Sequence, residues 1–334
     1  MSCWIGSAQV ASAVGFVETP LRANPDIDET NASTGHGFLA WDQERSRRPG
    51  HFDMYARING STVRVNRRTT EGFGGGIAGH TLVFESSSGS NDDVVLYNLA
   101  TGRRTGASSL NSWHGRQSHP TISGPWILFQ RQRHKVTKVV LYNAKTRKLS
   151  TVARSTSLSN SVYAGQVSGN HVVWGRAGTS TWDVFLYDIA KRTNTRIIRP
   201  PGVAFLYTPA VTADGTVYYS VGGSGCGQNV RIMRRSLNGT TVQLLRLPDL
   251  HDTGYMYASR DRNGVTSLLL NQSRCLDRTH YADHPWDVYE VKNAGRVEGT
   301  PTTSPAWTTS GDRSAATGRW RSVSVGPAGP IGTP

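Results

Sequence analysis

Short apolar runs recur along the chain, with polar loops between them. Four of these runs follow a glycine and read HTLVFES, PWILFQR, NHVVWGR and TVYYSVG. Each is followed, after a polar loop, by a second run, which reads DVVLYNL, KVVLYNA, DVFLYDI or NVRIMRR. β-Branched and aromatic residues dominate both sets, as is typical of strands. The pattern therefore predicts antiparallel strands that repeat along the chain.

The repeat has a regular period. The phrases that precede the first runs begin at Ile77, Ile122, Val167 and Val211, so the steps are 45, 45 and 44 residues. A period near 45 is typical of propeller blades or of helical arrays, and the β-rich content excludes the helical array. A turn such as Ala100-Thr101-Gly102 leads to a further strand. Each unit is therefore expected to contain four strands.

Two less regular copies extend the array to six units. Near the start, NPDID (24–28) precedes GFLAWDQE, and we interpret Glu29–His36 as an insertion. Near the end, Gln272–Pro285 is interpreted as a second insertion. One sheet cannot bury both of its faces alone, whereas copies packed around an axis can. The predicted fold is all-β, a six-bladed β-propeller of four-stranded antiparallel blades over residues 14–298.

The blade sequences also resemble a known family. HPTISGPWILF at 119–129 and WDVFLYDIAKRT at 182–193 are similar to the blades of TolB-like six-bladed β-propellers of bacteria. The resemblance covers about five-sixths of the chain and rests on four motifs in phase. It implies a binding module that makes protein–protein contacts or contacts with a cell-envelope polymer or glycan.

The two ends of the chain have different expected roles. An open ring would leave unpaired sheet edges, so VGFVETPL (14–21) is predicted to add a strand to the last blade. Residues 1–13 contain Ala11-Ser12-Ala13, which suits signal peptidase, but they have no basic start. They are either the remnant of a signal peptide that begins upstream, part of an ordinary N-terminal strand, or a disordered start. Residues 299–334, rich in Pro, Gly, Ser and Thr, are predicted to form a flexible tail.

The formal net charge is +14, from 37 basic and 23 acidic residues. Such a surplus can attract an anionic polymer or membrane surface. However, the basic residues are dispersed in short pairs such as Arg67-Arg68 and Arg234-Arg235, as codon bias in a GC-rich genome would also produce. No stretch is typical of a nucleic-acid-binding arm, so no specific nucleic-acid partner is predicted.

The three cysteines are Cys3, Cys226 and Cys275. Cys226 and Cys275 occupy matching loops of the fifth and sixth units, which should lie on one face of the ring. We predict that they form a disulfide, which would require an oxidising compartment. The alternative is two free thiols that face different directions. Together with residues 1–13 and the resemblance, this predicts an extracellular or envelope-associated protein.

Catalytic and cofactor-binding motifs are not found in the sequence. It has no Walker A, GxSxG, HExxH or dinucleotide-binding pattern and no C-x-x-C pair. The glycine-rich GFGGGIAG (72–79) is interpreted as a loop into an inner strand. The repeated aspartates are predicted to hold turns and not to form acid/base pairs; they are Asp53, Asp93, Asp183 and Asp287. No catalytic residue, metal or cofactor is assigned.

Loops that lead into the inner strands should converge at one end of the central channel. Aromatic and imidazole side chains in or near them form a candidate binding rim: Trp113, His114, His119, Tyr163, Tyr207 and Tyr255. Such rings can stack on a sugar, a base or a peptide side chain. The alternative is that they only cap the core of the channel.

These observations favour a non-catalytic binding module, exported and monomeric, with no transmembrane segment. The alternative is a propeller enzyme, a lyase or glycoside hydrolase, that acts on a carbohydrate at the channel mouth. A third reading is a basic module that adheres to an anionic polymer. A cluster of carboxylates or of His and Arg at the mouth would favour the enzyme, and a one-sided Arg face would favour adhesion. Rim aromatics without such a cluster would favour binding.

Overall fold

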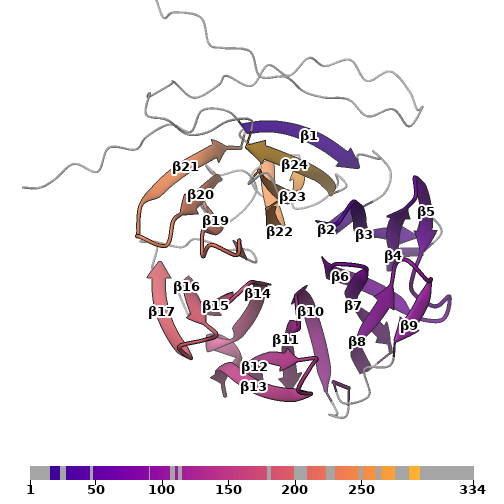
Figure 1. The fold of residues 1–334 in the computed structure, drawn as a ribbon, viewed down its shortest axis with the longest axis horizontal. Helices are drawn as coiled ribbons and strands as arrows, with labels where there is room; N and C mark the ends of the chain where they lie inside the picture. The colour runs from indigo at the N-terminus through magenta and orange to yellow at the C-terminus, as the bar shows by residue number, and fades with distance from the viewer. Residues whose placement is uncertain are drawn as a thin grey trace, which may run out of the picture.

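The computed structural model describes residues 16–22, 28–45, 48–89, 91–105, 110–111, 115–178, 182–198, 209–222, 230–247, 251–260, 265–274 and 286–293. These residues form six four-stranded sheets in a ring around a central axis (Figure 1). The predicted six-bladed β-propeller is therefore confirmed. The only helical element in the described ranges is a 3-10 turn, η1 (Leu158–Asn160). No helix there is both long and apolar enough to cross a membrane.

Each blade runs from an inner strand at the axis to an outer strand at the rim. Blade one is β2 (Glu29–Gly35), β3 (Phe38–Arg45), β4 (Arg48–Ile58) and β5 (Ser61–Arg64). Blade two is β6 (Glu71–Ala78), β7 (Thr81–Ser88), β8 (Asn91–Asn98) and β9 (Arg103–Thr105). Blade three is β10 (Arg116–Ser123), β11 (Trp126–Arg133), β12 (Val136–Asn143) and β13 (Lys148–Ser155).

The second half of the ring follows the same plan. Blade four is β14 (Val162–Ser168), β15 (His171–Ala177), β16 (Trp182–Asp188) and β17 (Thr193–Ile198). Blade five is β18 (Ala210–Val211), β19 (Val217–Val221), β20 (Arg231–Arg235) and β21 (Thr241–Arg246). Blade six is β22 (His251–Arg260), β23 (Thr266–Arg274), β24 (Asp287–Asn293) and, from the other end of the chain, β1 (Phe16–Arg22).

The ring is closed by β1, as the sequence predicted. This strand pairs antiparallel with β24, from Phe16 opposite Asn293 to Arg22 opposite Val288. Figure 1 shows the indigo strand beside the yellow one at the outer edge of blade six. An N-terminal segment thus becomes the outermost strand of the last blade, and it covers an edge that would otherwise be open.

The apolar runs are continuous because both faces of each blade are buried. In β7, Leu82 and Phe84 pack into the cluster shared with blade one, whereas Val83 packs into the cluster shared with blade three. All three side chains are fully buried. Because successive strand residues point to opposite faces, a run such as Leu-Val-Phe supplies two interfaces at once. The alternation typical of a half-exposed strand is therefore absent.

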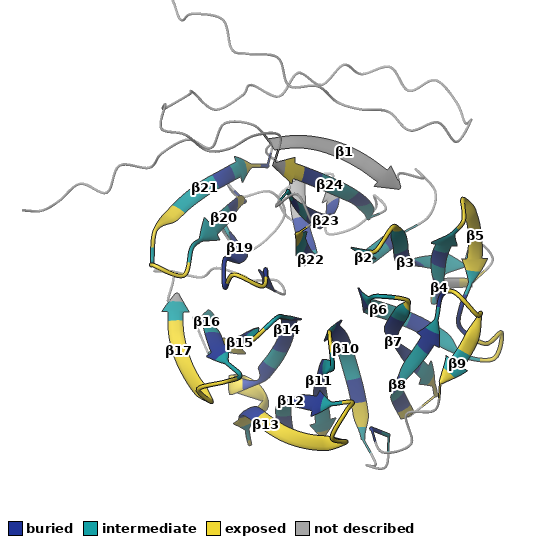
Figure 2. Cartoon of the chain, in the orientation of Figure 1, coloured by how far each residue is buried: buried dark blue, intermediate teal, exposed yellow. Residues whose placement is uncertain are grey.

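The hydrophobic core is divided among the junctions between blades. The described residues form six clusters, one at each junction, and each draws its members from two neighbouring blades. The outer strands contribute little, and β13 and β17 are largely exposed (Figure 2). The stability of the fold therefore resides in contacts between blades.

One predicted insertion proved wrong. Glu29–Gly35, assigned to an insertion, is β2, the inner strand of blade one. Its sequence, ETNASTG, is small and polar because inner strands line the channel, and only Ala32 joins a hydrophobic cluster. In blade six, Gln272–Arg274 also belong to a strand, β23, and not to an insertion. Residues 275–285 lie outside the described ranges.

The glycine-rich segment is also not a loop, because it forms most of β6. A Cβ atom at Gly75 would lie 2.3 Å from the carbonyl oxygen of Val83, and one at Gly76 would lie 2.8 Å from the backbone nitrogen of Ile122. The glycines therefore allow the strand to approach its neighbour in the sheet and the next blade closely.

Among the repeated aspartates, Asp53 has several side-chain partners, and it is 3% exposed. Its carboxylate accepts from Arg45 at 2.7 Å and from Asn66 Nδ2 at 2.9 Å, and it pairs with Arg64 at 3.1 Å. This aspartate therefore binds side chains, and the partners that the structure gives it are not the backbone N–H groups of a turn.

Cys226 and Cys275 lie outside the described residues, so their disulfide stays a prediction. The roles of residues 1–13 and 299–334 also stay predictions.

Removing β1 should destabilise the propeller. Deletion of residues 16–22 would expose the edge of β24 and remove a ladder whose hydrogen bonds are worth about 1 kcal/mol each. We expect a lower free energy of unfolding and a lower Tm, measured by urea and thermal denaturation. Deletion of residues 2–8 serves as the control. An unchanged Tm after loss of 16–22 would contradict ring closure by this strand.

Close approach at β6 can be tested with a single methyl group. Gly76→Ala should lower the free energy of unfolding by about 1–3 kcal/mol, because backbone must move to accept the added carbon. Gly175→Ala is the matched control, since its Cβ would lie 3.9 Å from the nearest atom. Equal stability of the two variants in urea titrations would show that β6 is not tightly packed.

Candidate functional site

A pocket of about 410 Å³ lies at one end of the channel and draws its lining from five of the six blades. We call it the channel-mouth pocket. Six aromatic or imidazole rings line it: Phe52, His119, Tyr163, Trp182, Tyr255 and Trp286. Polar side chains join them, namely Asp28, Thr30, Asn31 and Asn271. Mostly apolar walls with a few convergent polar groups are typical of a ligand site.

Three of the predicted rim residues meet in this pocket. His119 from blade three, Tyr163 from blade four and Tyr255 from blade six all line it. The other three, Trp113, His114 and Tyr207, lie outside the described residues. The structure thus brings together every predicted rim residue that it describes.

Breaks in strand pairing shape the mouth. Five inner strands carry a register shift at an equivalent place, at Thr30/Ser33, Phe73/Gly75, Ser118/Thr121, Ala164/Val167 and Thr253/Met256. Such bulges re-aim side chains and are enriched beside functional sites. Asn31, His119 and Tyr255 lie within these breaks, and all three line the pocket.

Two of these residues adopt a backbone conformation that is uncommon for residues other than glycine. Asn31 has φ of 49° and His119 has φ of 53°, and blade two has Gly74 at the corresponding place with φ of 40°. The left-handed region costs most residues with a side chain about 1–2 kcal/mol, and asparagine tolerates it better than the others. Local contacts must therefore hold Asn31 and His119 in place. Strain of this kind is concentrated at functional sites.

His119 is held from two sides. Its Nε2 atom is hydrogen-bonded to the Tyr255 hydroxyl, and the two rings stack with centroids 5.0 Å apart. Its backbone N–H donates to Glu85 Oε2 at 3.3 Å. These contacts link blades two, three and six at the mouth.

A second pair of rings forms another wall. Tyr163 and Trp182 stack with centroids 5.0 Å apart and planes 28° from parallel. Both side chains are partly exposed. An offset pair of this kind is rigid and presents a flat apolar surface to a ligand.

Sequence analysis missed three of the pocket's rings, although a signal was present. Phe52, Trp182 and Trp286 each directly precede a repeated aspartate, in blades one, four and six. Aligning the repeats one residue further back would have placed an aromatic side chain at the same position in three blades. Because equivalent positions of a propeller lie on the same face, these rings converge.

Ionisable groups lie behind the pocket wall. Burial raises the pKa of Glu85 to about 8, and the nearby negative charge of Asp92 adds to the effect. Burial likewise raises the pKa of Asp42 to about 6, although Asn31 Nδ2 and Thr30 Oγ1 donate to it at 2.9 and 3.0 Å. Both carboxyls therefore hold residues of the pocket and do not line it themselves.

The His119–Tyr255 pair is neutral at physiological pH. Burial lowers the pKa of His119 to about 4, and the positive charge of Arg116 contributes. Burial also raises the pKa of Tyr255 well above its ordinary value. The lining of the pocket at this point is therefore an uncharged, hydrogen-bonded pair, suited to contact an uncharged part of a ligand.

Hydrogen bonds cross the channel axis. Gln166 accepts from the backbone N–H groups of Val211 and Ala258, at 3.2 and 2.9 Å, and donates to the Ala258 carbonyl at 2.6 Å. It lies two residues further along β14 than Ala164, which lines the pocket. The Tyr257 hydroxyl donates to the Ile77 carbonyl at 3.4 Å. These hydrogen bonds join blades two, four, five and six.

Metal-ligand clusters do not occur in the described part of the chain. No group of three or more His, Cys, Asp or Glu side chains there is placed to hold an ion.

Similar solved structures share this architecture. Regucalcin from Agrobacterium tumefaciens, described as a calcium-binding protein, is 14% identical with a TM-score of 0.53, over 88% of this chain and all of its own. A putative TolB from the same organism is 11% identical with a TM-score of 0.52, over 72% of this chain and 91% of its own. TolB from Acinetobacter baumannii is 16% identical with a TM-score of 0.47, over 83% of this chain.

The fold is thus that of TolB-like six-bladed β-propellers, in agreement with the resemblance in the sequence. The chain spans 63% of the length of the Acinetobacter TolB and 40% of a prolyl endopeptidase that it also resembles. No protein-family model and no curated protein sequence matches the chain. At these identities the likeness establishes the fold alone.

The buried carboxyl of Glu85 should make stability fall with rising pH. Its pKa is raised in the folded state, from 4.5 to about 8, so the folded protein holds a proton that the unfolded chain releases between those values. Stability is therefore greatest below about pH 4.5 with respect to this group and declines until about pH 8. Glu85→Gln should flatten that decline in urea titrations across the range.

Asp188→Asn is the control for this experiment. A hydrogen bond from the Lys191 backbone N–H lowers the pKa of Asp188, so this carboxylate stays ionised throughout the same pH range. Its replacement should leave the slope unchanged. If Glu85→Gln kept the slope of the unsubstituted protein, Glu85 would not be the buried, protonated group that the structure indicates.

Proposed function

We propose that this protein is a non-catalytic binding module that holds a carbohydrate segment of a cell-envelope polymer in its channel-mouth pocket. The observation that carries the proposal is the convergence of aromatic rings and polar side chains from five blades in one cavity. No blade could make such a site alone.

The chemistry of the lining suits a sugar. The stacked pair of Tyr163 and Trp182 offers a flat apolar surface for the C–H face of a ring. Asp28 accepts one hydrogen bond, from the Trp286 backbone N–H at 2.9 Å, and an ionised carboxylate has capacity for more. Hydroxyl groups at the edge of the sugar would pair with such acceptors. The neutral His119–Tyr255 pair accommodates an uncharged ligand.

The proposal extends to a partner and a location. A polymer that enters the mouth would be an envelope component, so the proposal includes export to an extracellular or envelope-associated position. TolB-like propellers are fold neighbours, and the resemblance of the sequence to them supports this setting. An apolar side chain of a protein partner is the other ligand that this pocket could take, and the binding experiment below distinguishes the two.

A second candidate function is supported by one observation. Carboxyls with raised pKa values beside a pocket are typical of general acids, and Glu85 and Asp42 meet that description. This favours the alternative of a lyase or glycoside hydrolase. Neither carboxyl lines the pocket, however. Each accepts a hydrogen bond from a residue that does line it, Glu85 from His119 and Asp42 from Asn31. We therefore assign them a positioning role.

Binding should depend on the stacked rings. We expect a glycan array to identify an uncharged cell-wall oligosaccharide and calorimetry to measure its Kd. Tyr163→Ala and Trp182→Ala should each weaken binding about tenfold or more, which corresponds to about 1.4 kcal/mol. The loss should persist at high salt, because the contact is apolar. Trp126→Ala, at the opposite end of blade three, is the matched control and should bind normally.

Two results would redirect the assignment. If no glycan binds while an envelope protein is captured through Trp182, the module is one that binds proteins. If the bound oligosaccharide is cleaved, and Glu85→Gln retains binding but abolishes cleavage, the protein is an enzyme. Binding that survives both ring substitutions would exclude the channel-mouth pocket.

A further inference from the structure

We propose that a second pocket, at the end of blade three, is a binding site for a phosphate group. This blade-three pocket has a volume of about 280 Å³ and lies among β10, β11, β12 and β13. Five cationic side chains line it: Arg116, Arg131, Arg133, Lys138 and Arg154. None of the described residues that line it is acidic.

The charge of this pocket is only partly neutralised. Arg116 pairs with the buried carboxylate of Asp92. Arg131 donates to the Leu110 carbonyl at 2.6 Å, which fixes its guanidinium without removing its charge. Arg133 and Arg154 are exposed and make no ion pair within the described ranges. A cavity with several converging positive charges attracts an anion strongly.

A buried amide gives independent evidence for a ligand. Gln117 lines the same pocket and is only 1% exposed, yet neither Nε2 nor Oε1 has a hydrogen-bond partner among the residues that the structure describes. Buried polar groups are almost always paired, and an unpaired one requires an explanation. An oxyanion in the pocket would accept from Nε2 and supply the missing partner.

The donor set favours phosphate over carboxylate. Arginine presents a rigid fork of N–H donors that matches the oxygens of a phosphate or a carboxylate. Here several guanidinium groups, an ammonium and an amide surround one small cavity. A carboxylate has two oxygens and a single charge, whereas a phosphate monoester carries more oxygens and about 1.5–2 charges. Only a phosphate has enough oxygens and charge to pair with all of these guanidinium, ammonium and amide donors.

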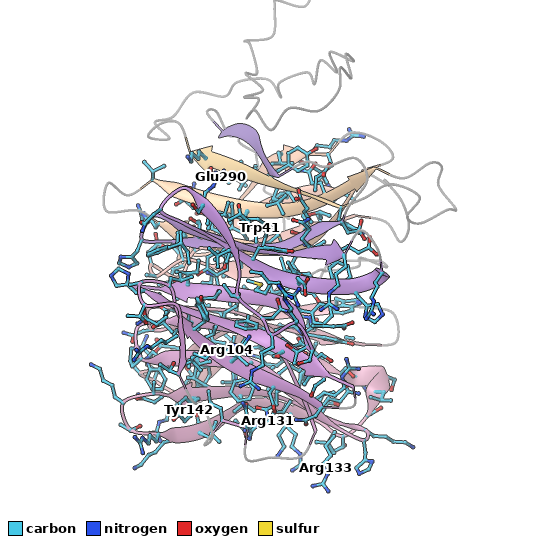
Figure 3. The ribbon with its side chains drawn as sticks, turned by 90° about the vertical axis from the view of Figure 1, so that its right-hand side faces the viewer. Trp41, Arg104, Arg131, Arg133, Tyr142 and Glu290 are labelled. Atoms are coloured by element: carbon cyan, nitrogen blue, oxygen red, sulfur yellow. The ribbon has the colours of Figure 1, made fainter. Side chains whose placement is uncertain are left out.

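The site lies at the same end of the ring as the channel-mouth pocket. Arg116 and His119 both belong to β10 and are three residues apart, or about 10 Å. Figure 3 shows Arg133 at one face of the molecule and Tyr142 toward the other, so the pocket occupies one end of blade three. A phosphate-bearing glycan could therefore reach both pockets. That extension rests on the proposed function, whereas the phosphate site itself does not.

The test is calorimetric titration of the full chain with inorganic phosphate, at constant ionic strength. We expect saturable binding that weakens at least about tenfold in Arg133→Gln/Arg154→Gln. Gln117→Met should also weaken it, with little change in Tm. The matched control is Arg103→Gln/Arg192→Gln, which removes two exposed arginines elsewhere and lowers the net charge equally. This control should bind phosphate normally.

Two further titrations, with acetate and with polymers that do or do not carry phosphate, test the selectivity of the site. Acetate at the same ionic strength should show no saturable binding, and a polysaccharide that carries phosphate monoester groups should bind more tightly than the same polysaccharide without them. Equal losses in the two double variants, equal binding of acetate, or the absence of saturable phosphate binding would each overturn the proposal. Phosphate binding that persists in Trp182→Ala while neutral glycan binding is lost would show that the two pockets are independent.

Discussion

The structure depends on one constraint, which is that no blade can bury both faces of its own sheet. Leu82, Val83 and Phe84 in β7 show the consequence, because neighbouring residues of one strand serve two different interfaces. The core therefore exists only between blades, and the ring is stable only when it is closed. The pairing of β1 with β24 supplies that closure and joins the two ends of the propeller. An outer strand such as β13 can be largely exposed because most members of the clusters lie on the inner three strands, and β13 adds only Val152 and Ala153.

A closed ring also explains why a site forms at the channel mouth. Inner strands converge at the axis, so small side chains and glycines such as Gly75 and Gly76 are needed where backbones approach each other. Register breaks then turn Asn31, His119 and Tyr255 toward the opening. Hydrogen bonds to buried carboxyls stabilise the strained backbone at these places. The rigidity required for packing therefore also preorganises the pocket for a ligand.

The six-bladed fold could be predicted from the sequence because the apolar runs repeat about every 45 residues. These runs form the contacts between blades. Elements without that signal were misread. Strand β2 is polar because it faces the channel, and β6 contains the glycines that close packing requires. The rim was found in part, since His119, Tyr163 and Tyr255 sit on inner strands, whereas Trp182 comes from a third strand. Gln117 gave no signal at all, because its significance lies in the partner that its buried amide lacks.

The central claim is that the channel-mouth pocket receives a sugar ring. A crystal structure of the protein with a neutral cell-wall oligosaccharide tests it most directly. Our account predicts a sugar ring against the exposed side of the stacked Tyr163–Trp182 pair, with its hydroxyl groups directed toward Asp28. A sugar bound on the outer strands or at the opposite end of the channel, with the pocket filled only by solvent, would contradict it.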